Sequence, residues 1–179
     1  SASVTVHPTP IVIVEGNTTV CRNITPTPKI TFINPQQLPI IITYNINGES
    51  NQVINVAANS SATVNQSTFI PGVFNYNLIS VKYQGSPACE NPSSVTASIT
   101  VLDIPTATIS ENLIVCQYDD PAVITISNPQ ELSVLVTYSI DGINQPAIEI
   151  EPLSDYSLIQ PTDIPQTFTY QLISVSYSD

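Results

Sequence analysis

The chain has 179 residues, enough for one large domain or for two of about 90 to 100 residues. It is rich in Val, Ile, Thr, Tyr, Ser and Asn, has 16 prolines and lacks Met and Trp, which favours short strands over helices. A formal charge of −11 disfavours nucleic acid and anionic membrane surfaces as partners, and no apolar stretch approaches the roughly 18 residues needed to span a bilayer.

Three segments of the chain occur twice at an almost constant spacing. TFINPQQLPIIITYNING (31–48) aligns with TISNPQELSVLVTYSIDG (125–142), and FNYNLISVKY (74–83) with FTYQLISVSY (168–177), both at an offset of 94 residues. VTVHPTPIVIVEGNTTVC (4–21) aligns with ITVLDIPTATISENLIVC (99–116) at an offset of 95. This shared register predicts two homologous domains in tandem.

The alignment also predicts domain boundaries. SVTV at the start (Ser3, Val4, Thr5, Val6) matches SITV at 98–101, directly before the second repeat. We therefore expect residues 1–7 to be the last strand of a preceding repeat, 8–102 to be repeat 1, and 103–179 to be repeat 2 without its final strand. Both ends are then expected to be cuts from a longer array. The two repeats are joined by VLDIPTATIS, which contains a proline and is expected to be short and semi-rigid.

Seven short strands are predicted in repeat 1, near 10–14, 28–33, 39–46, 51–57, 61–68, 73–83 and 94–102. In the third, apolar residues alternate from Leu38 to Ile46 and run into Asn-Gly; repeat 2 does the same and ends in Asp-Gly, a strong hairpin signal. In the sixth, the apolar set shifts after Leu78 to Ile79, Val81 and Tyr83, which indicates a bulge or burial on both faces. An immunoglobulin-like β-sandwich is predicted, with its exact topology left open.

The three cysteines suggest a disulfide. Cys21 and Cys89 belong to repeat 1, and Cys116 matches Cys21 in repeat 2, whose second cysteine would fall beyond the end of the chain. We predict a Cys21–Cys89 bridge with Cys116 left unpaired by truncation, and hence an oxidising, extracellular setting. The alternative is three unrelated thiols.

Catalytic chemistry is not indicated. The single histidine, His7, lies outside both repeats and cannot serve a nucleophile in each. Eleven of the 14 acidic residues lie from Asp103 onward, without any Lys or Arg. Asp119 and Asp120 in YDDP are weak candidates for calcium ligands, aided by Glu111 or Asp103; a solvated acidic surface is the favoured alternative, and no other cofactor is expected.

The tyrosines divide into two groups. Tyr44, Tyr76, Tyr138 and Tyr170 alternate along predicted strands and are expected in the cores. Tyr83, Tyr118, Tyr156 and Tyr177 are weak candidates for a sugar-stacking platform, with ordinary strand or rim positions as the alternative.

The order of PTATIS…VC, a TYxI(N/D)G hairpin, FxYxLISV, a cysteine and a closing TASITV resembles the tandem immunoglobulin-like repeats of large Bacteroidota surface adhesins, including gliding-motility adhesins exported by type IX secretion. The Asn-Pro-Gln segment departs from that pattern, which is often glycine-rich there. The resemblance implies a stalk-forming or adhesive repeat on the extracellular cell surface, with no catalytic residues.

Three functions follow as hypotheses. The first is a non-catalytic, semi-rigid repeat of a secreted adhesin or filament, whose partners are neighbouring repeats, another cell or surface glycans. The second is a filament subunit that donates the strand Ser3–Val6 to an identical subunit. The third is a carbohydrate-binding module. Nucleic acid binding and membrane insertion are not expected.

Overall fold

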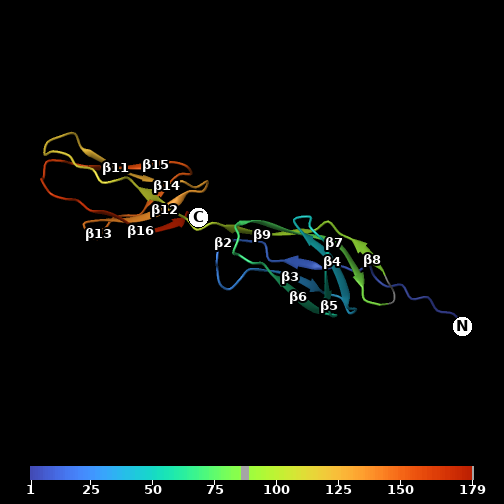
Figure 1. The fold of residues 1–179 in the computed structure, drawn as a ribbon. Coiled ribbons are helices and arrows are strands. Elements are labelled where there is room, and N and C mark those ends of the chain that lie inside the picture. Colours follow the sequence, from blue (N-terminus) through green and yellow to red (C-terminus); the bar gives the residue numbers. More distant parts are fainter. Residues whose placement is uncertain (86–88, 179) are drawn as a thin grey trace. The chain divides into compact units, whose positions relative to one another are not determined.

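A computed structural model of the chain describes residues 1–85 and 89–178, which are drawn in Figure 1. These residues form strands and turns and no helix, so none of them belongs to a helix that could cross a membrane. The chain divides into two compact units, Ser1–Ile104 and Pro105–Asp179. The all-β class predicted from the sequence is confirmed.

The first unit is a sandwich of two sheets. Its described part contains the strands β1 (Ile13–Glu15), β2 (Thr18–Cys21), β3 (Lys29–Asn34), β4 (Ile40–Ile46), β5 (Gln52–Val56), β6 (Ser60–Asn65), β7 (Gly72–Tyr83), β8 (Glu90–Pro92) and β9 (Thr96–Leu102). One sheet has the order β1-β3-β6 and the other β2-β9-β7-β4-β5, with β8 also on β7 (Figure 1). The strand pairs are antiparallel except β2 with β9, which run parallel. This is an immunoglobulin-like sandwich.

The core of the first unit follows the two-residue period of its strands. Alternate side chains point to opposite faces of a strand, so every second residue enters the space between the sheets. The buried apolar residues of β3, β4, β7 and β9 are Ile30, Phe32, Ile40, Ile42, Tyr44, Tyr76, Leu78, Val81, Tyr83, Ala97, Ile99 and Val101. The alternation predicted from the sequence thus builds most of this core.

The shift in the apolar pattern of FNYNLISVKY is a β-bulge. On β4, Thr43 lies opposite Ser80 and the next residue, Tyr44, lies opposite Leu78, so Ile79 is the extra residue. Because of this insertion, the apolar residues on both sides of Ile79 point into the core while Ile79 itself lies on the surface. The bulge predicted from the sequence is confirmed.

The second unit repeats this architecture with fewer strands. Its described part contains β10 (Thr108–Ile109), β11 (Ala122–Ser127), β12 (Val134–Ile140), β13 (Ile143–Asn144), β14 (Ile148–Ile150), β15 (Asp155–Gln160) and β16 (Tyr170–Tyr177). One sheet has the order β10-β11-β15; in the other, β12 pairs with β13, β14 and β16. The bulge recurs between Thr137 and Tyr138. Among the described residues no strand corresponds to β2, and the counterparts of β8 and β9 would fall after Asp179.

The asparagine of each Asn-Pro-Gln segment, Asn34 or Asn128, is buried and forms a set of hydrogen bonds to the backbone that is called the staple below. The amide of Asn34 donates to the carbonyl oxygens of Leu38 and Ala57, both at 2.9 Å, and its Oδ1 accepts from the backbone N–H of Gln36 at 3.0 Å. Asn128 makes the equivalent bonds to Leu132, Glu151 and Gln130. Burying these carbonyls without donors would be costly, which explains why an asparagine recurs in the core.

The two predicted hairpin turns adopt the backbone that their sequences favour. Asn47 and Gly48 have φ of 53° and 78°, and Asp141 and Gly142 have φ of 50° and 78°. Positive φ at both central positions is the geometry of a type I′ turn. In the second unit this turn joins β12 directly to β13, with Ile140 opposite Ile143.

Candidate functional site

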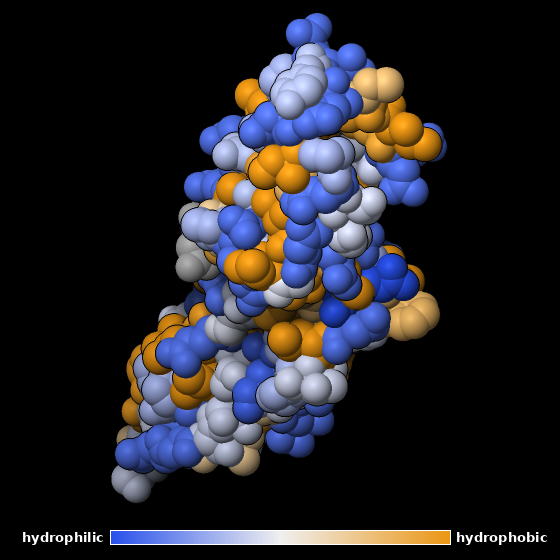
Figure 2. All heavy atoms as spheres, turned by 90° about the vertical axis from the view of Figure 1, so that its left-hand side faces the viewer, coloured by the Kyte–Doolittle hydropathy of each residue, from blue (hydrophilic) through white to orange (hydrophobic). Residues whose placement is uncertain are grey.

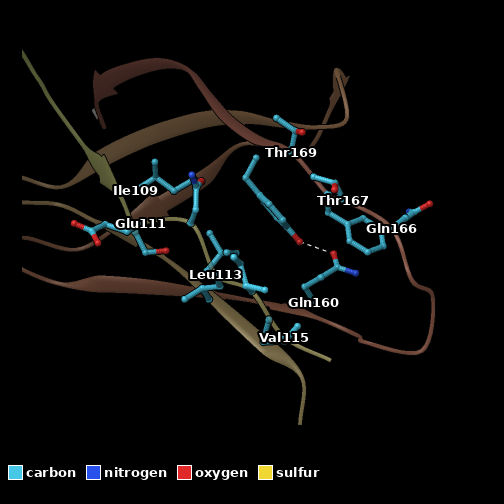
Figure 3. A pocket seen from close by; sticks show the side chains of 15 residues that line it. Ile109, Glu111, Leu113, Val115, Gln160, Gln166, Thr167 and Thr169 are labelled. Atoms are coloured by element: carbon cyan, nitrogen blue, oxygen red, sulfur yellow. Dashed lines mark hydrogen bonds between the residues drawn. The ribbon is translucent and has the colours of Figure 1, made fainter. Parts of the chain in front are cut away.

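A groove lies in the second unit. It has a volume of about 500 Å³ and is walled by residues 109–115 on one side and 166–170 on the other, with Ala122, Ile124 and Gln160 between them. Figure 3 shows Leu113 and Val115 on one wall and Gln166, Thr167 and Thr169 on the opposite wall. A second hollow of about 270 Å³ adjoins it and shares Val115, Gln160 and Phe168.

The first unit shows what fills the equivalent place there. Strand β9 lies between β2 and β7, with Ile99 beside Thr18 on β2 and beside Phe74 on β7. The residues that match Thr18 and Phe74 in the repeat are Leu113 and Phe168, and both line the groove. The groove is therefore the position of a last strand between two walls that match β2 and β7.

Burial changes as expected for a sheet without counterparts of β8 and β9. On β7, Tyr76, Leu78, Val81 and Tyr83 are all at most 3 % exposed. Their counterparts on β16, Tyr170, Leu172, Val175 and Tyr177, are only half-buried. On the opposite wall Ile114 is 99 % exposed. The second unit thus shows apolar surface where the first unit has a packed core.

The groove offers binding groups rather than reactive ones. The Tyr170 hydroxyl donates to Gln160 Oε1 at 2.6 Å, the dashed line in Figure 3, and Tyr76 bonds Gln66 in the same way at 2.7 Å. Burial, with smaller contributions from Tyr138 and Asp141, raises the pKa of Tyr170 above its ordinary value. The hydroxyl therefore stays protonated and donates its proton to the amide. The recurrence of Gln66 and Gln160 at this position was not anticipated from the sequence.

The structure places the candidate donor strand on the surface. Residues 3–6 form no strand, and the side chains of Val4 and Val6 are 90 % and 87 % exposed. Exposed apolar side chains elsewhere occur in small groups among hydrophilic residues on the face drawn in Figure 2. Strand donation by Ser3–Val6 stays a prediction.

The predicted Cys21–Cys89 disulfide is contradicted by the strand order. Both cysteines are free thiols, as is the exposed Cys116. Cys21 lies beside Leu102, next to the Gly72 end of β7, whereas the carbonyl of Cys89 accepts from Tyr83 at the other end. The length of β7 is about 35 Å at ~3.3 Å per residue, far beyond the Cα spacing of a disulfide. The disulfide therefore no longer supports an oxidising setting, nor the prediction that truncation left Cys116 without its partner.

The calcium candidates take structural roles. Asp119 caps a tight turn, with its Oδ2 accepting from the backbone N–H of Cys116 at 2.8 Å, and Asp103 forms an ion pair with Arg22 at 3.6 Å. Over residues 1–85 and 89–178, no three His, Cys, Asp or Glu side chains are placed to hold a metal ion together. Calcium binding, with Asp120 as a further candidate, stays a prediction.

The tyrosines fall mostly where expected. Tyr44, Tyr76 and Tyr138 are buried and Tyr170 is half-buried. Tyr83, offered as a sugar-stacking residue, is only 3 % exposed, so that assignment is wrong. Tyr118 and Tyr156 are exposed and Tyr177 is half-buried; glycan binding by these residues stays a prediction.

Comparison with known proteins finds similar structures but no sequence family. No family model and no curated protein matches the chain. The FN1–FN3 domains of chicken CNTN1 are 15 % identical with a TM-score of 0.39, over 95 % of this chain and 61 % of that one. The YadV chaperone is 12 % identical with a TM-score of 0.39, over 93 % and 87 %. The Salmonella enterica SafA pilin in complex with the SafB chaperone is 12 % identical with a TM-score of 0.35, over 94 % and 99 %. At these identities and TM-scores no function is transferred from them.

Proposed function

We propose that the chain is a non-catalytic repeat of a large secreted surface adhesin or filament, in which successive sandwiches form a semi-rigid stalk. The observation that carries this proposal is that the two units share their interiors and differ on their surfaces. The staple of Asn34 and Asn128, the bulge and the hydrogen-bonded Tyr–Gln pair all recur. A duplicated scaffold without a duplicated surface site is what a spacer requires.

The distribution of charge also differs between the surfaces of the two units. The first unit has three basic and four acidic residues, whereas the second has ten acidic residues and no Lys or Arg. Such a difference would disrupt a shared charged ligand site, but it leaves the uncharged cores intact. The acidic surface opposes aggregation of a long array. The resemblance to Bacteroidota surface adhesins noted above agrees with this function and implies export by type IX secretion.

The test is the size and location of the native polypeptide. An antibody against this chain should detect, after reduction and denaturation, a species far above 19.3 kDa. Treatment of intact cells with a protease should remove that signal, while a cytoplasmic marker in the same cells persists. A species that survives protease on intact cells and disappears only after lysis would contradict a surface stalk.

A second candidate function is favoured by the groove. A surface subunit of about 19 kDa that assembles by strand donation would use the exposed residues 3–6 as donor and the groove as acceptor. Detection of a surface species of that mass, instead of a much larger one, would select this function over a covalent stalk.

A further inference from the structure

We propose that the groove of the second unit binds residues 1–7 of a second copy of the chain, as a strand parallel to 113–116 and antiparallel to 166–171, the segment that leads into β16. This inference rests on the second candidate function and deepens it, because it names the acceptor residues, the direction and the register. It concerns association between separate chains in solution, so it is tested by a measurement distinct from the mass of the native polypeptide.

The donor segment matches the strand that fills the same place in the first unit. SASVTVH (1–7) aligns with TASITVL (96–102), which is β9. In β9 the inward residues are Ala97, Ile99 and Val101, all at most 3 % exposed. Their counterparts are Ala2, Val4 and Val6, which are exposed in this structure. The segment therefore has the small–branched–branched alternation that the position requires.

The register follows from the pairing of β9. Ile99 lies beside Thr18 and Phe74, and Val101 lies beside Val20 and Gly72. With the repeat offsets, Val4 would lie beside Leu113 and Phe168.

By the same offsets, Val6 would lie beside Val115 and Gln166, and Ala2 beside Tyr170. All five of these acceptor residues line the groove. One register thus matches every inward residue of the donor with a wall residue.

The side-chain volumes also agree. Val4 is one methylene smaller than Ile99, while Leu113 is larger than Thr18, so the apolar volume of this neighbouring pair is roughly kept. The donor segment carries no acidic residue, so the ten acidic residues of the second unit do not repel it. Backbone hydrogen bonds to residues 166–171 supply the remaining attraction, as in strand addition generally.

The experiment uses the full chain and two variants, each disabling one partner. Val4→Asp places a charge on the inward face of the donor, and Leu113→Asp places one in the groove. Both side chains are exposed in the free chain, so neither change should affect folding, which circular dichroism verifies. Ser3→Asp is the matched control, because it adds the same charge one residue away, on the opposite face of the donor strand.

Sedimentation over a range of concentrations should show head-to-tail oligomers for the unchanged chain and for Ser3→Asp, and monomers for Val4→Asp and for Leu113→Asp. An equimolar mixture of Val4→Asp and Leu113→Asp should form a dimer and nothing larger, because only one donor and one acceptor remain functional per pair.

Two results would overturn the proposal. One is an unchanged chain that stays monomeric at every concentration, whether its groove is empty or filled by its own residues 1–7. The other is a mixture of Val4→Asp and Leu113→Asp that fails to dimerise while the unchanged chain still associates. Neither result affects the immunoblot of the native polypeptide, so this inference and the stalk function fail separately.

Discussion

The buried staple allows a sharp test by a single-atom change. Asn34→Asp keeps the shape of the side chain and the acceptor for the N–H of Gln36, but it replaces the donor amide by a carboxyl oxygen. That oxygen then faces the carbonyls of Leu38 and Ala57 at the former hydrogen-bond distance of 2.9 Å, with the carbonyl of Val56 at 3.5 Å. Asn34 is only 1 % exposed, so water cannot replace the lost donor.

The expected loss of stability is large for a domain of this size. Each carbonyl left without its donor costs about 1–3 kcal/mol, and the two together, with the buried carboxyl, give about 3–5 kcal/mol. Burial and the facing oxygens should raise the pKa of the new carboxyl above its unfolded value of about 3.9. The folded state is then least impaired below that value and loses stability as the pH rises through the raised pKa, so the deficit should shrink in acid.

Urea unfolding of the full chain, followed by circular dichroism, measures this deficit. Asn34→Asp should lower the transition of the first unit by about 2–3 M, and the equivalent Asn128→Asp should lower the transition of the second unit. Asn55→Asp, the same change at an exposed position of β5, should cost less than about 0.5 kcal/mol. A deficit for Asn34→Asp below about 1 kcal/mol, or one that is the same at every pH, would refute the reasoning.

Three other outcomes are expected. Burial, with a smaller contribution from a neighbouring tyrosine, raises the pKa of Tyr76 to about 12. The protonated hydroxyl of Tyr76 therefore makes its full contribution to the free energy of unfolding below pH ~10, and roughly 3 kcal/mol of stability should be lost as the pH rises to about 12. Alkaline unfolding that Tyr76→Phe does not alter would contradict this. Gly16→Ala should destabilise the first unit by at least about 1–3 kcal/mol, because its φ is 120° and a Cβ would overlap the carbonyl oxygen of Lys29. Gly48→Ala is the control, because the φ of 78° is also strained for alanine but a Cβ there would meet no atom within 4 Å. An equal loss of stability in Gly48→Ala would show that the overlap with Lys29 is not the cause. Alkylation without reductant should modify three thiols per chain, the exposed Cys116 first, and a mass showing one thiol would restore the disulfide.

Much of the fold could be predicted because its signals are local. The alternation that ends in Asn-Gly gave the hairpin of β4, and the shift at Ile79 gave the bulge, since each depends on neighbouring side chains alone. The short strands β2 and β8 were not predicted, because each has at most four residues and depends on pairing with a distant strand.

The disulfide and the staple show what a repeat alignment cannot supply. The match of Cys21 with Cys116 shows that the two positions are structurally equivalent, but says nothing about which residue lies near either of them. In the same way, the recurrence of Asn34 and Asn128 was visible in the sequence, whereas the carbonyls that they bind lie up to 23 residues away. The sequence predicted that a strand is missing from repeat 2, but only the structure shows which residues form the walls of the groove.

The parallel pairing of β2 with β9 has a mechanical consequence. Tension applied through the two ends of the first unit pulls these neighbouring strands in opposite directions along their axes, so the ladder from Thr18 and Ile99 to Cys21 and Leu102 is loaded in shear. Its bonds must then break together instead of one after another. A strand seated in the groove of the second unit, parallel to residues 113–116, should be loaded in shear in the same way and should raise the force that this unit withstands.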